Sequence, residues 1–375
     1  KISQAGGSPK IDMSISGLMV GGSSLRTRIR SLSPLQGVGM MLLLMHPSPR
    51  WRVSSASHTL ARGLLGTLQS PQAGKRYRFS HLRMRGGAEA LLSASLWQGM
   101  GNELAKRLDG TGIQVKLVPC LGDNYCPIIH HVASGCTLIV DTPEAAPIIV
   151  ALREAGWTPT HVLNTHHHFD HVGGNTALKK EYPAIEIIGP HDCTEPQHEE
   201  IPLIDHPVRE GEKINFGDLS AEILHVPGHT HGHIAYFFPS VPLLLSGDAL
   251  FTMGCGRVFT GDFEKMRASL SKIRSLPGDT IVYSAHEYTA SNVRFAQQVE
   301  PRNSALAERA KQVELLRSLG LPTVPTLLAH EFASNPFLRW DVPEVQEVVG
   351  TVDADAAFTA VRKWKDTGSR PEVRN

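Results

Sequence analysis

The stretch of this 375-residue chain with the clearest chemical potential is THHHFDHVGGN, residues 165–175. It contains the pattern HxHxDH, formed by His166, His168, Asp170 and His171. In an extended backbone, alternate side chains project to the same side, so His166 and His168 can reach one metal ion. Asp170 and His171 follow where the chain turns, and they can reach a second ion. Imidazole nitrogen and carboxylate oxygen suit Zn²⁺, and also Fe²⁺ or Mn²⁺.

The alternative to a metal site here is a surface cluster of histidines. Three adjacent histidines could arise by chance, whereas the complete HxHxDH followed by Gly-Gly-Asn favours a metal centre. We expect His167 to point away from the ions, because it alternates with its neighbours. Gly173 and Gly174 should let the backbone turn tightly into the next helix.

Three further candidate ligands lie downstream, each just after a short apolar run that predicts a strand. They are His229 in VPGHTHGH, Asp248 in LLLSGDALF and His286 in IVYSAHEYT. A sheet fixes the directions of side chains at its strand ends, which suits metal ligands. Two more histidines, His231 and His233, follow His229 closely, and we expect them to be structural or to support the ligands.

The elements that must position these residues follow from apolar periodicity. Strand and helix patterns mix up to about residue 288, which indicates an α/β core. From Asn303 the pattern becomes helical, and several prolines interrupt it. The expected strands are 114–119, 126–131, 136–141, 161–163, 186–188, 221–226, 234–238, 243–246 and 281–283, and the expected helices are 144–155, 263–275, 290–299 and 305–318.

With HxHxDH after a strand, the chain resembles the metallo-β-lactamase superfamily. The resemblance implies an αββα sandwich of the α/β class, with two divalent metal ions, most simply Zn²⁺, at one edge of the two sheets. It also implies two ligand sets that share a bridging carboxylate. The first ligand set is His166, His168 and His229, the second ligand set is Asp170, His171 and His286, and the bridge is Asp248.

Within the superfamily, residues 113–366 are similar to the glyoxalase II family of hydroxyacylglutathione hydrolases. The resemblance implies a catalytic domain at 113–288 and a small, all-helical, glutathione-binding C-terminal domain at 289–375. The motifs that carry it are VKLVPCLGDNYCPII, LFTMGCGRVFTG, AHEYTASNVRFAQQVEP, PTVPTLLAHEFASNPFLR and AVRKWKD.

The implied reaction is hydrolysis of S-D-lactoylglutathione and related S-2-hydroxyacylglutathiones to D-lactate and glutathione, the second step of methylglyoxal detoxification. A hydroxide between the metals would attack the thioester, with Asp170, His171 and Asp248 as the catalytic residues. The residues implied to contact glutathione are Arg257, Phe259, His286, Tyr288, Arg362 and Lys365.

Arginine and lysine suit glutathione because it carries two carboxylates. From their spacing alone, however, Arg362 and Lys365 would form a solvated helix face. Phe259 stands where many members of the family have tyrosine, so a phenol hydrogen bond would be lost there. Cys255 lies between Gly254 and Gly256, and we expect it to have a packing role rather than to act as a nucleophile.

Two alternatives to the hydrolase remain open. A glutathione persulfide dioxygenase of the same superfamily would bind a single iron through a subset of these ligands, but the GCGRVF loop and the helical tail favour the hydrolase. A non-catalytic metal-binding protein would not need a shared bridging carboxylate. A β-lactamase is less favoured, because the glutathione-binding tail would have no purpose in it. A nuclease of this fold would need an added nucleic-acid-binding region, and the net charge of −11 on residues 89–375 argues against polyanionic substrates.

The N-terminal region differs sharply from the rest in charge. Residues 1–88 contain 13 Lys and Arg and a single acid, Asp12. This composition predicts a largely disordered presequence over residues 1–100 that targets a mitochondrion or a plastid. Translation from Met100 would instead give a cytoplasmic protein, and the stretch could also be untranslated or wrongly joined sequence. A basic arm that binds nucleic acid is less favoured, because few aromatic residues lie between the arginines.

Composition sets two further expectations. The five cysteines form no CxxC pair, which argues against a disulfide framework and suits a reducing compartment. No apolar run reaches the roughly 18 residues that would predict a membrane-spanning helix. We expect a monomer by default and no nucleic-acid or membrane partner. The resemblance implies that the partner is the small-molecule glutathione thioester.

Overall fold

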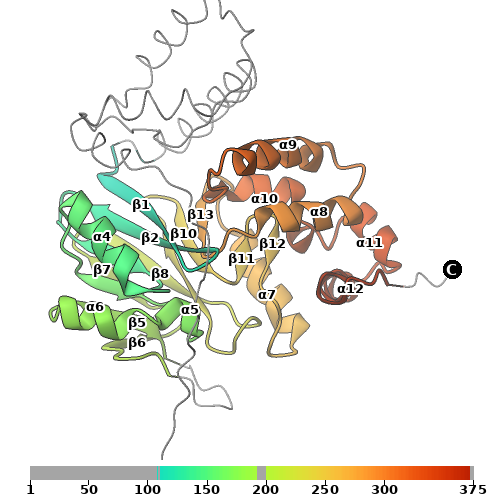
Figure 1. Ribbon diagram of the computed structural model, residues 1–375. Coiled ribbons are helices and arrows are strands. Elements are labelled where there is room, and N and C mark those ends of the chain that lie inside the picture. The colour runs from blue at the N-terminus through green and yellow to red at the C-terminus, as the bar shows by residue number, and fades with distance from the viewer. Residues whose placement is uncertain (1–107, 109, 192–199, 372–375) are drawn as a thin grey trace, which may run out of the picture. The chain divides into compact units, whose positions relative to one another are not determined.

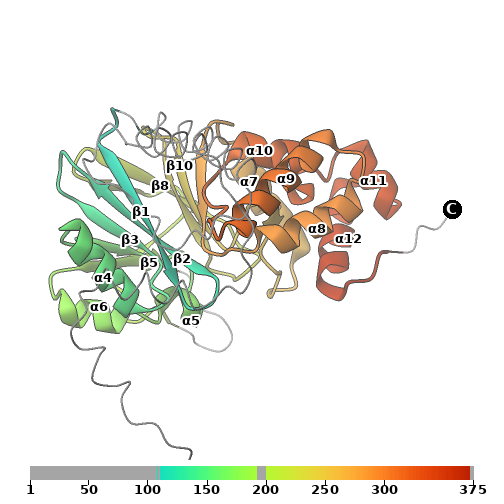
Figure 2. The same ribbon diagram turned by 45° about the horizontal axis from the view of Figure 1, so that its top comes forward.

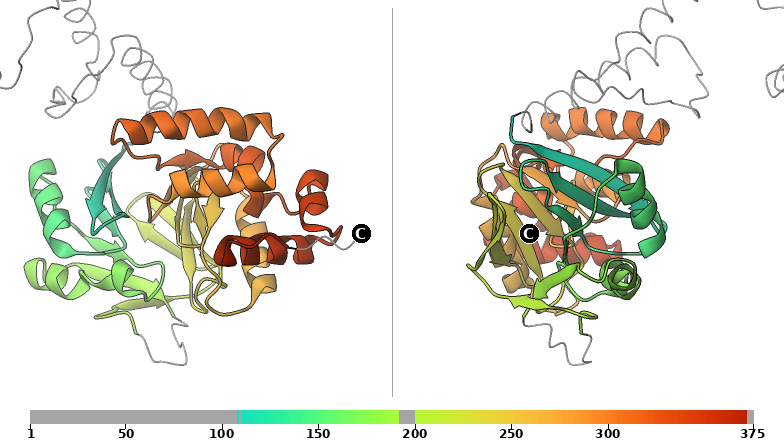
Figure 3. Two further views of the ribbon diagram at one scale, coloured as in Figure 1. Left: turned by 45° about the vertical axis from the view of Figure 1, so that its right-hand side comes forward. Right: turned by 90° about the vertical axis from the view of Figure 1, so that its left-hand side faces the viewer.

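A computed structural model describes residues 108, 110–191 and 200–371, and the predicted presequence lies outside the described residues. The described residues form two six-stranded sheets that face each other, with helices on both outer faces (Figure 1, Figure 3). This is the αββα sandwich that the sequence predicts. No described helix has the length and apolar character needed to cross a membrane.

The first sheet has the strand order β1-β2-β3-β4-β5-β6. Strands β1 to β3 are antiparallel, and β3 to β6 are parallel. Parallel neighbours need crossover connections, and α4 and α6 provide them on the outer face of this sheet (Figure 2). The bounds are β1 Ile113–Cys120, β2 Asn124–His131, β3 Thr137–Val140, α4 Ala145–Ala155, β4 His161–Leu163, α5 Phe169–Val172, α6 Asn175–Glu181, β5 Glu186–Pro190 and β6 His206–Val208.

The second sheet has the order β14-β13-β10-β9-β8-β7. Strands β7 to β10 form an antiparallel meander, and β13 returns parallel to β10 after the crossover helix α7. A small ribbon, β11 with β12, follows β10. The bounds are β7 Lys213–Phe216, β8 Leu219–His225, β9 Ile234–Phe238, β10 Leu243–Gly247, β11 Leu250–Phe251, β12 Gly254–Cys255, α7 Phe263–Arg274 and β13 Ile281–Ser284.

The C-terminal part is helical apart from β14, a two-residue strand that adds to the edge of the second sheet beside β13. Strand β14 was not predicted from the sequence, because two residues carry no periodicity. Side-chain caps begin two of the helices: Asn303 accepts from Leu306 N, and Asp353 accepts from Ala356 N. The bounds are α8 Thr289–Val299, α9 Ser304–Ser318, β14 Thr326–Leu327, α10 Leu328–Ser334, the 3₁₀ helix η2 Pro336–Leu338, α11 Pro343–Val349 and α12 Ala354–Thr367.

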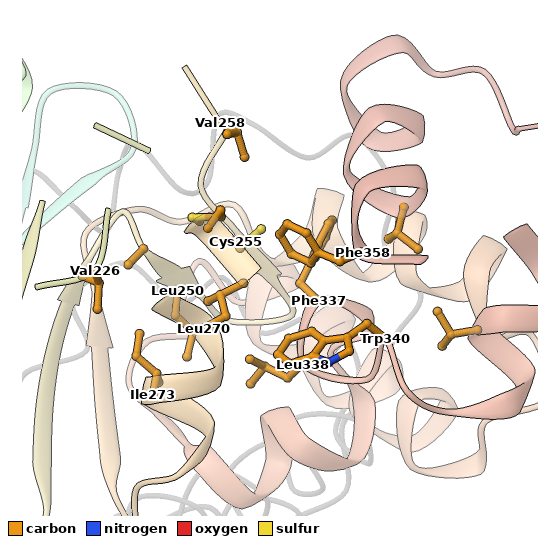
Figure 4. Close-up of a cluster of buried hydrophobic side chains, with 14 of the residues drawn as sticks. Val226, Leu250, Cys255, Val258, Leu270, Ile273, Phe337, Leu338, Trp340 and Phe358 are labelled. Carbon is orange, nitrogen blue, oxygen red and sulfur yellow. The ribbon is translucent and has the colours of Figure 1, made fainter. Parts of the chain in front are cut away.

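Two apolar cores determine how these parts fit together. Between the sheets, Ile129 and Leu163 of the first sheet pack in one buried cluster with Tyr236 of the second. On the outer face of the second sheet, a further cluster joins α7 to the C-terminal helices, where Phe337 and Phe358 lie close to Leu270 (Figure 4). The C-terminal helices and the second sheet therefore share a core.

Candidate metal centre

The seven predicted ligands converge at one edge of the sandwich. They lie in the loops or short helix that directly follow β4, β8, β10 and β13. Strands β10 and β13 are parallel neighbours, so their carboxyl ends meet at the same edge and bring Asp248 beside His286. The groups whose ligand atoms lie within 4.8 Å of one another are His166, His168 and His229; His166, His171 and Asp248; and Asp170, His171 and His286.

The first ligand set consists of three imidazoles. The Nδ1 atom of His168 lies 3.0 Å from His166 Nε2 and 3.1 Å from His229 Nε2. Three ring nitrogens that point at one another cannot all be satisfied by sharing protons, whereas a cation can accept a lone pair from each. This set therefore has the donor chemistry of a zinc-type site.

Asp248 connects the two ligand sets, because its two carboxylate oxygens face different sets. Its Oδ2 atom lies 3.4 Å from His229 Nε2, in the first set. Its Oδ1 atom lies 3.4 Å from His286 Nε2 and 3.6 Å from His171 Nε2, in the second set. The same two imidazole nitrogens face Asp170 Oδ2, at 3.3 Å and 3.5 Å respectively.

The residues fit a pair of divalent cations by a further test. Among the buried side-chain atoms that the structure describes, His171 Nε2 and Asp248 Oδ1 make no hydrogen bond. A buried polar atom without a partner costs about 1–3 kcal/mol. Both orphaned atoms point into the centre, where a cation would satisfy them together.

The protonation states also suit a cation. Burial, followed by the charges of neighbouring histidines, lowers the pKa of His168 to about 4 and that of His166 well below its usual range. Burial alone would raise the pKa of Asp170, but the neighbouring imidazoles of His171 and His286 outweigh it and hold the pKa far below the ordinary value. Neutral imidazoles and an ionised carboxylate are the forms that bind metal ions.

His286 behaves differently from the first ligand set. Burial alone would lower its pKa, but the nearby carboxylates of Asp248 and Asp170 outweigh this and raise the pKa to about 10. In the metal-free protein this imidazole therefore carries a proton at neutral pH. A cation that binds the second ligand set must displace that proton.

Two further residues support the ligands: Asp141, which was not singled out from the sequence, and His233, for which a supporting role was expected. Asp141 Oδ2 accepts from His171 Nδ1 at 2.8 Å, and its Oδ1 accepts from Thr165 N at 2.8 Å. His233 Nε2 accepts the backbone N–H of Asp248 at 3.1 Å. The sequence signals were a strand that ends on an acid at Asp141 and, for His233, the third histidine of the GHTHGH run. His167 is absent from the ligand groups, as its alternation predicts.

The glycines beside the centre provide space. At Gly256 a Cβ atom would lie 2.1 Å from the Asp248 carbonyl oxygen, so any side chain there would push the bridging residue away. Gly173 and Gly174 have negative φ angles of −58° and −84°, which any residue adopts. The expected reason, a turn that only glycine can make, is therefore wrong. A Cβ atom at Gly173 would lie 2.9 Å from Phe169 O, and this crowding is what requires glycine.

Two exposed aromatic rings flank the centre, and both were predicted to contact substrate. The ring of Phe259, 61% exposed, lies 5.2 Å from that of His229 and 5.7 Å from that of His168. The ring of Tyr288 stacks on His286 with centroids 4.6 Å apart. Each ligand set thus has an aromatic side chain on its solvent side.

Two of the three predicted cations, Arg257 and Arg362, pair with Asp366, and Lys365 is its neighbour in the chain; we call these four residues the cationic face. Arg257 is exposed and lies 3.4 Å from Asp366. Arg362 is only 5% exposed, and it donates to Asp366 at 2.8 Å and to the Cys255 carbonyl at 3.0 Å. The solvated helix face expected from spacing is therefore wrong for Arg362, because α12 turns this side chain onto the buried ribbon β11–β12.

Lys365 donates to the Ser291 carbonyl at 3.3 Å. Burial, followed by the charge of Arg362, lowers its pKa to about 8. Cys255 is buried against this face, and burial raises the pKa of its thiol to about 11. A thiol with so high a pKa is a poor nucleophile, which agrees with the expected packing role.

Comparisons with known proteins agree with this geometry. Residues 129–286 match the metallo-beta-lactamase superfamily, and residues 287–368 match the hydroxyacylglutathione hydrolase C-terminus. The hydroxyacylglutathione hydrolase of Rhodopseudomonas palustris strain CGA009 is 47% identical over 256 residues, which are 68% of this chain and 98% of the relative. This chain belongs to the hydroxyacylglutathione hydrolase family.

A second family member, from Rhodopseudomonas palustris strain BisB5, is 49% identical over 254 residues, which are 67% of this chain and 98% of that relative. Among solved structures, the BLEG-1 B3 metallo-beta-lactamase aligns with a TM-score of 0.46 at 23% identity, over 60% of this chain and 99% of that one. Membership of the superfamily implies a binuclear divalent metal centre, and the two ligand sets are where this hydrolase would hold it.

Proposed function

We propose that this hydroxyacylglutathione hydrolase cleaves S-D-lactoylglutathione and related S-2-hydroxyacylglutathiones to a 2-hydroxy acid and glutathione. The observation that carries the proposal is the bridging geometry of Asp248, whose two oxygens face the two ligand sets. Family membership supports the reaction class. A persulfide dioxygenase with a single iron would have no use for the bridge.

We propose two Zn²⁺ ions as the resident metals, with iron or manganese as the alternatives. When bound, two such cations supply Lewis acidity, which activates a water and polarises a thioester carbonyl. Imidazole and carboxylate donors suit all three metals, so the ligands alone do not select one. Metal analysis of the protein purified from its own source, without added metal, tests this choice, and one equivalent of iron alone would contradict it.

The protein's own residues contribute fixed directions and charge. The three imidazoles of the first ligand set are held at the strand ends, so they need no reorganisation when substrate arrives. Asp170 is ionised and half-exposed, and it can accept a hydrogen bond from the attacking water and orient it. Phe259 and Tyr288 cover the two ends of the centre and limit the access of other water.

We propose that the cationic face binds the glutathione half of the substrate. Arg257 and Lys365 can pair with its carboxylates, because the Arg257 side chain is exposed next to His229 and Lys365 is only partly buried. Arg362 is buried, and we propose that it positions Asp366 and the Cys255 carbonyl behind these contacts. The glutathione half of the substrate then positions the thioester for hydrolysis, so substrates with different acyl groups can be accepted.

The direct test is the loss of thioester absorbance when the purified full-length chain is mixed with S-D-lactoylglutathione. We expect rapid hydrolysis that a chelator abolishes and added Zn²⁺ restores. A folded, metal-loaded sample without turnover would contradict the proposal. Oxygen uptake with glutathione persulfide would then be the decisive second assay.

We also propose that residues 1–100 direct the enzyme to a mitochondrion or plastid. The support is compositional: residues 1–88 carry a net charge of +12 and are rich in serine and arginine. Fusion of this segment to a fluorescent reporter tests the idea, with a matched segment in which the arginines are replaced by glutamine as the control. A cytoplasmic reporter would overturn it.

We propose that the enzyme acts as a monomer. All seven predicted ligands and the whole cationic face come from one chain, so the centre needs no residue from a second copy. Light scattering after size exclusion should give a mass near 40.9 kDa for the full chain. A concentration-independent dimer mass would contradict this.

A further inference from the structure

The turn between β1 and β2, residues 121–123, reaches across from the first sheet to the end of β13 in the second. Asn124 forms an isolated antiparallel bridge with His286. Tyr125 N donates to Ala285 O at 2.6 Å, and Glu287 N donates to Asp123 O at 2.9 Å. The backbone of this turn is thus tied to the residues on both sides of a metal ligand.

The side chains of the turn hold two members of the second ligand set. Asp123 Oδ1 accepts from His286 Nδ1 at 2.9 Å. Asn124, which is buried, donates from Nδ2 to Asp170 Oδ2 at 3.0 Å and to the Asp170 carbonyl at 3.2 Å. These neighbouring residues therefore fix one imidazole and one carboxylate that are more than a hundred positions apart in the sequence.

The two ligand sets differ in what lies behind their imidazoles. In the second set, His286 and His171 each contact a carboxylate through Nδ1, that of Asp123 or Asp141. In the first set, His229 Nδ1 contacts only the Arg257 carbonyl, at 2.8 Å. A carboxylate behind the ring fixes the tautomer and makes the opposite nitrogen a stronger donor to a metal ion.

Asp123 also acts on the aromatic ring above the second set. Tyr288 stacks on His286 with an interplanar angle of 6°. The carboxylate of Asp123 accepts from the imidazole on which this ring lies. A single exposed carboxylate thus supports a metal ligand and, through that ligand, the position of a predicted substrate contact.

We propose that Asp123 and Asn124 are positioning residues that hold the second ligand set in its metal-binding arrangement. The proposal rests on the two-metal centre of the proposed function. It concerns the affinity of one metal position, which is measurable without substrate. Loss of the support behind a ligating histidine typically weakens metal affinity about 10–100-fold.

The test uses metal-free full-length protein and competition for Zn²⁺ with a chromophoric chelator. In Asp123→Ala we expect one of the two dissociation constants to rise about 10–100-fold and the other to change less than about twofold. Asp123→Asn should lie between this variant and the wild type, because an amide oxygen still accepts from Nδ1 but carries no charge. The control is Asp218→Ala, an exposed acid in the β7–β8 turn at the far edge of the second sheet.

A purely structural role predicts a different result, a lower melting temperature of the metal-free protein with both zinc constants unchanged. That outcome, in either Asp123→Ala or Asp123→Asn, would overturn the proposal. Asp123→Asn keeps the shape of the turn, so it remains informative if Asp123→Ala does not fold. A wild type that binds two zinc ions without hydrolysing thioester would refute the proposed function and leave this test intact.

Discussion

The metal centre and the cationic face are both clusters of charged and polar side chains, but their internal pairing differs. In the metal centre, ring nitrogens face one another, and His171 Nε2 and Asp248 Oδ1 make no hydrogen bond to the described residues. In the cationic face, Arg257 and Arg362 already pair with Asp366. The metal centre requires an added cation. The ion pairs of the cationic face are already formed, and they can be exchanged for pairs with a substrate carboxylate. Changes to the first should therefore remove catalysis, and changes to the second should weaken binding.

The largest effect should come from Asp248→Ala. The substitution removes the only described side chain that faces both ligand sets, so both positions should lose affinity for metal. Metal catalysis is worth several kcal/mol, so turnover should fall by about three orders of magnitude or more. Steady-state kinetics together with metal analysis measure this. Unchanged metal content and turnover in this variant would contradict the bridging role of Asp248.

A smaller and more selective effect is expected from Asp141→Ala. The change leaves His171 Nδ1, in the second ligand set, without its carboxylate acceptor, whereas Asp141 reaches His166 of the first set only through the Thr165 hydroxyl. We expect metal affinity at one position to fall about 10–100-fold. In chelator competition, the variant should release its two metal ions in two well-separated steps. The two steps of the wild type should lie closer together. Equal weakening at both positions would contradict a selective role.

Arg362→Ala should act on the Michaelis constant. The variant removes hydrogen bonds to Asp366 and to the Cys255 carbonyl, and each bond to a charged group is worth about 1.5–3 kcal/mol. We expect KM to rise about tenfold with kcat nearly unchanged, and the melting temperature to fall. Arg302→Ala, an exposed arginine whose partners lie on α11, is the control. A fall in kcat at constant KM would place Arg362 with the metal centre instead.

The smallest effect is a pH dependence of binding. The pKa of Lys365 is lowered to about 8, so the side chain is charged below that pH and neutral above it. Attraction for a substrate carboxylate is therefore lost as the pH rises from 7 to 9, and KM should increase. A partly exposed ion pair contributes up to about 1 kcal/mol, which is roughly fivefold. In Lys365→Met the profile of KM in this range should be flat; an unchanged profile would exclude Lys365 as its source.

The sequence predicted those features that depend on neighbours along the chain. The ligands of the HxHxDH motif lie within six residues, and the expected helices 144–155 and 305–318 agree with α4 and α9 within one residue. Strands β6 and β7 were missed because they are short and have mostly exposed side chains, so they lack an apolar alternation. Periodicity detects a buried face and fails where there is none.

Long-range contacts were not predictable in this way. Asp123 and His286 are 163 positions apart, and nothing near Asp123 indicates that its carboxylate will accept from an imidazole. The burial of Arg362 depends on the Phe337 ring, 4.8 Å from its guanidinium, and on the Cys255 carbonyl. Both outcomes are set by how the sheets and helices pack, which one sequence does not encode locally.

The apolar cluster that joins α7 to the C-terminal helices has a mechanical consequence. Phe337, Trp340 and Phe358 are packed into the same cluster as Leu250, two residues after Asp248 (Figure 4). Because such a core deforms little, the cationic face cannot swing towards or away from the metal centre. The distance between the cationic face and the metal centre is then fixed, and it selects the length of the substrate. A peptide thioester longer or shorter than the one it fits would anchor its carboxylates and leave its carbonyl out of register with the ligands.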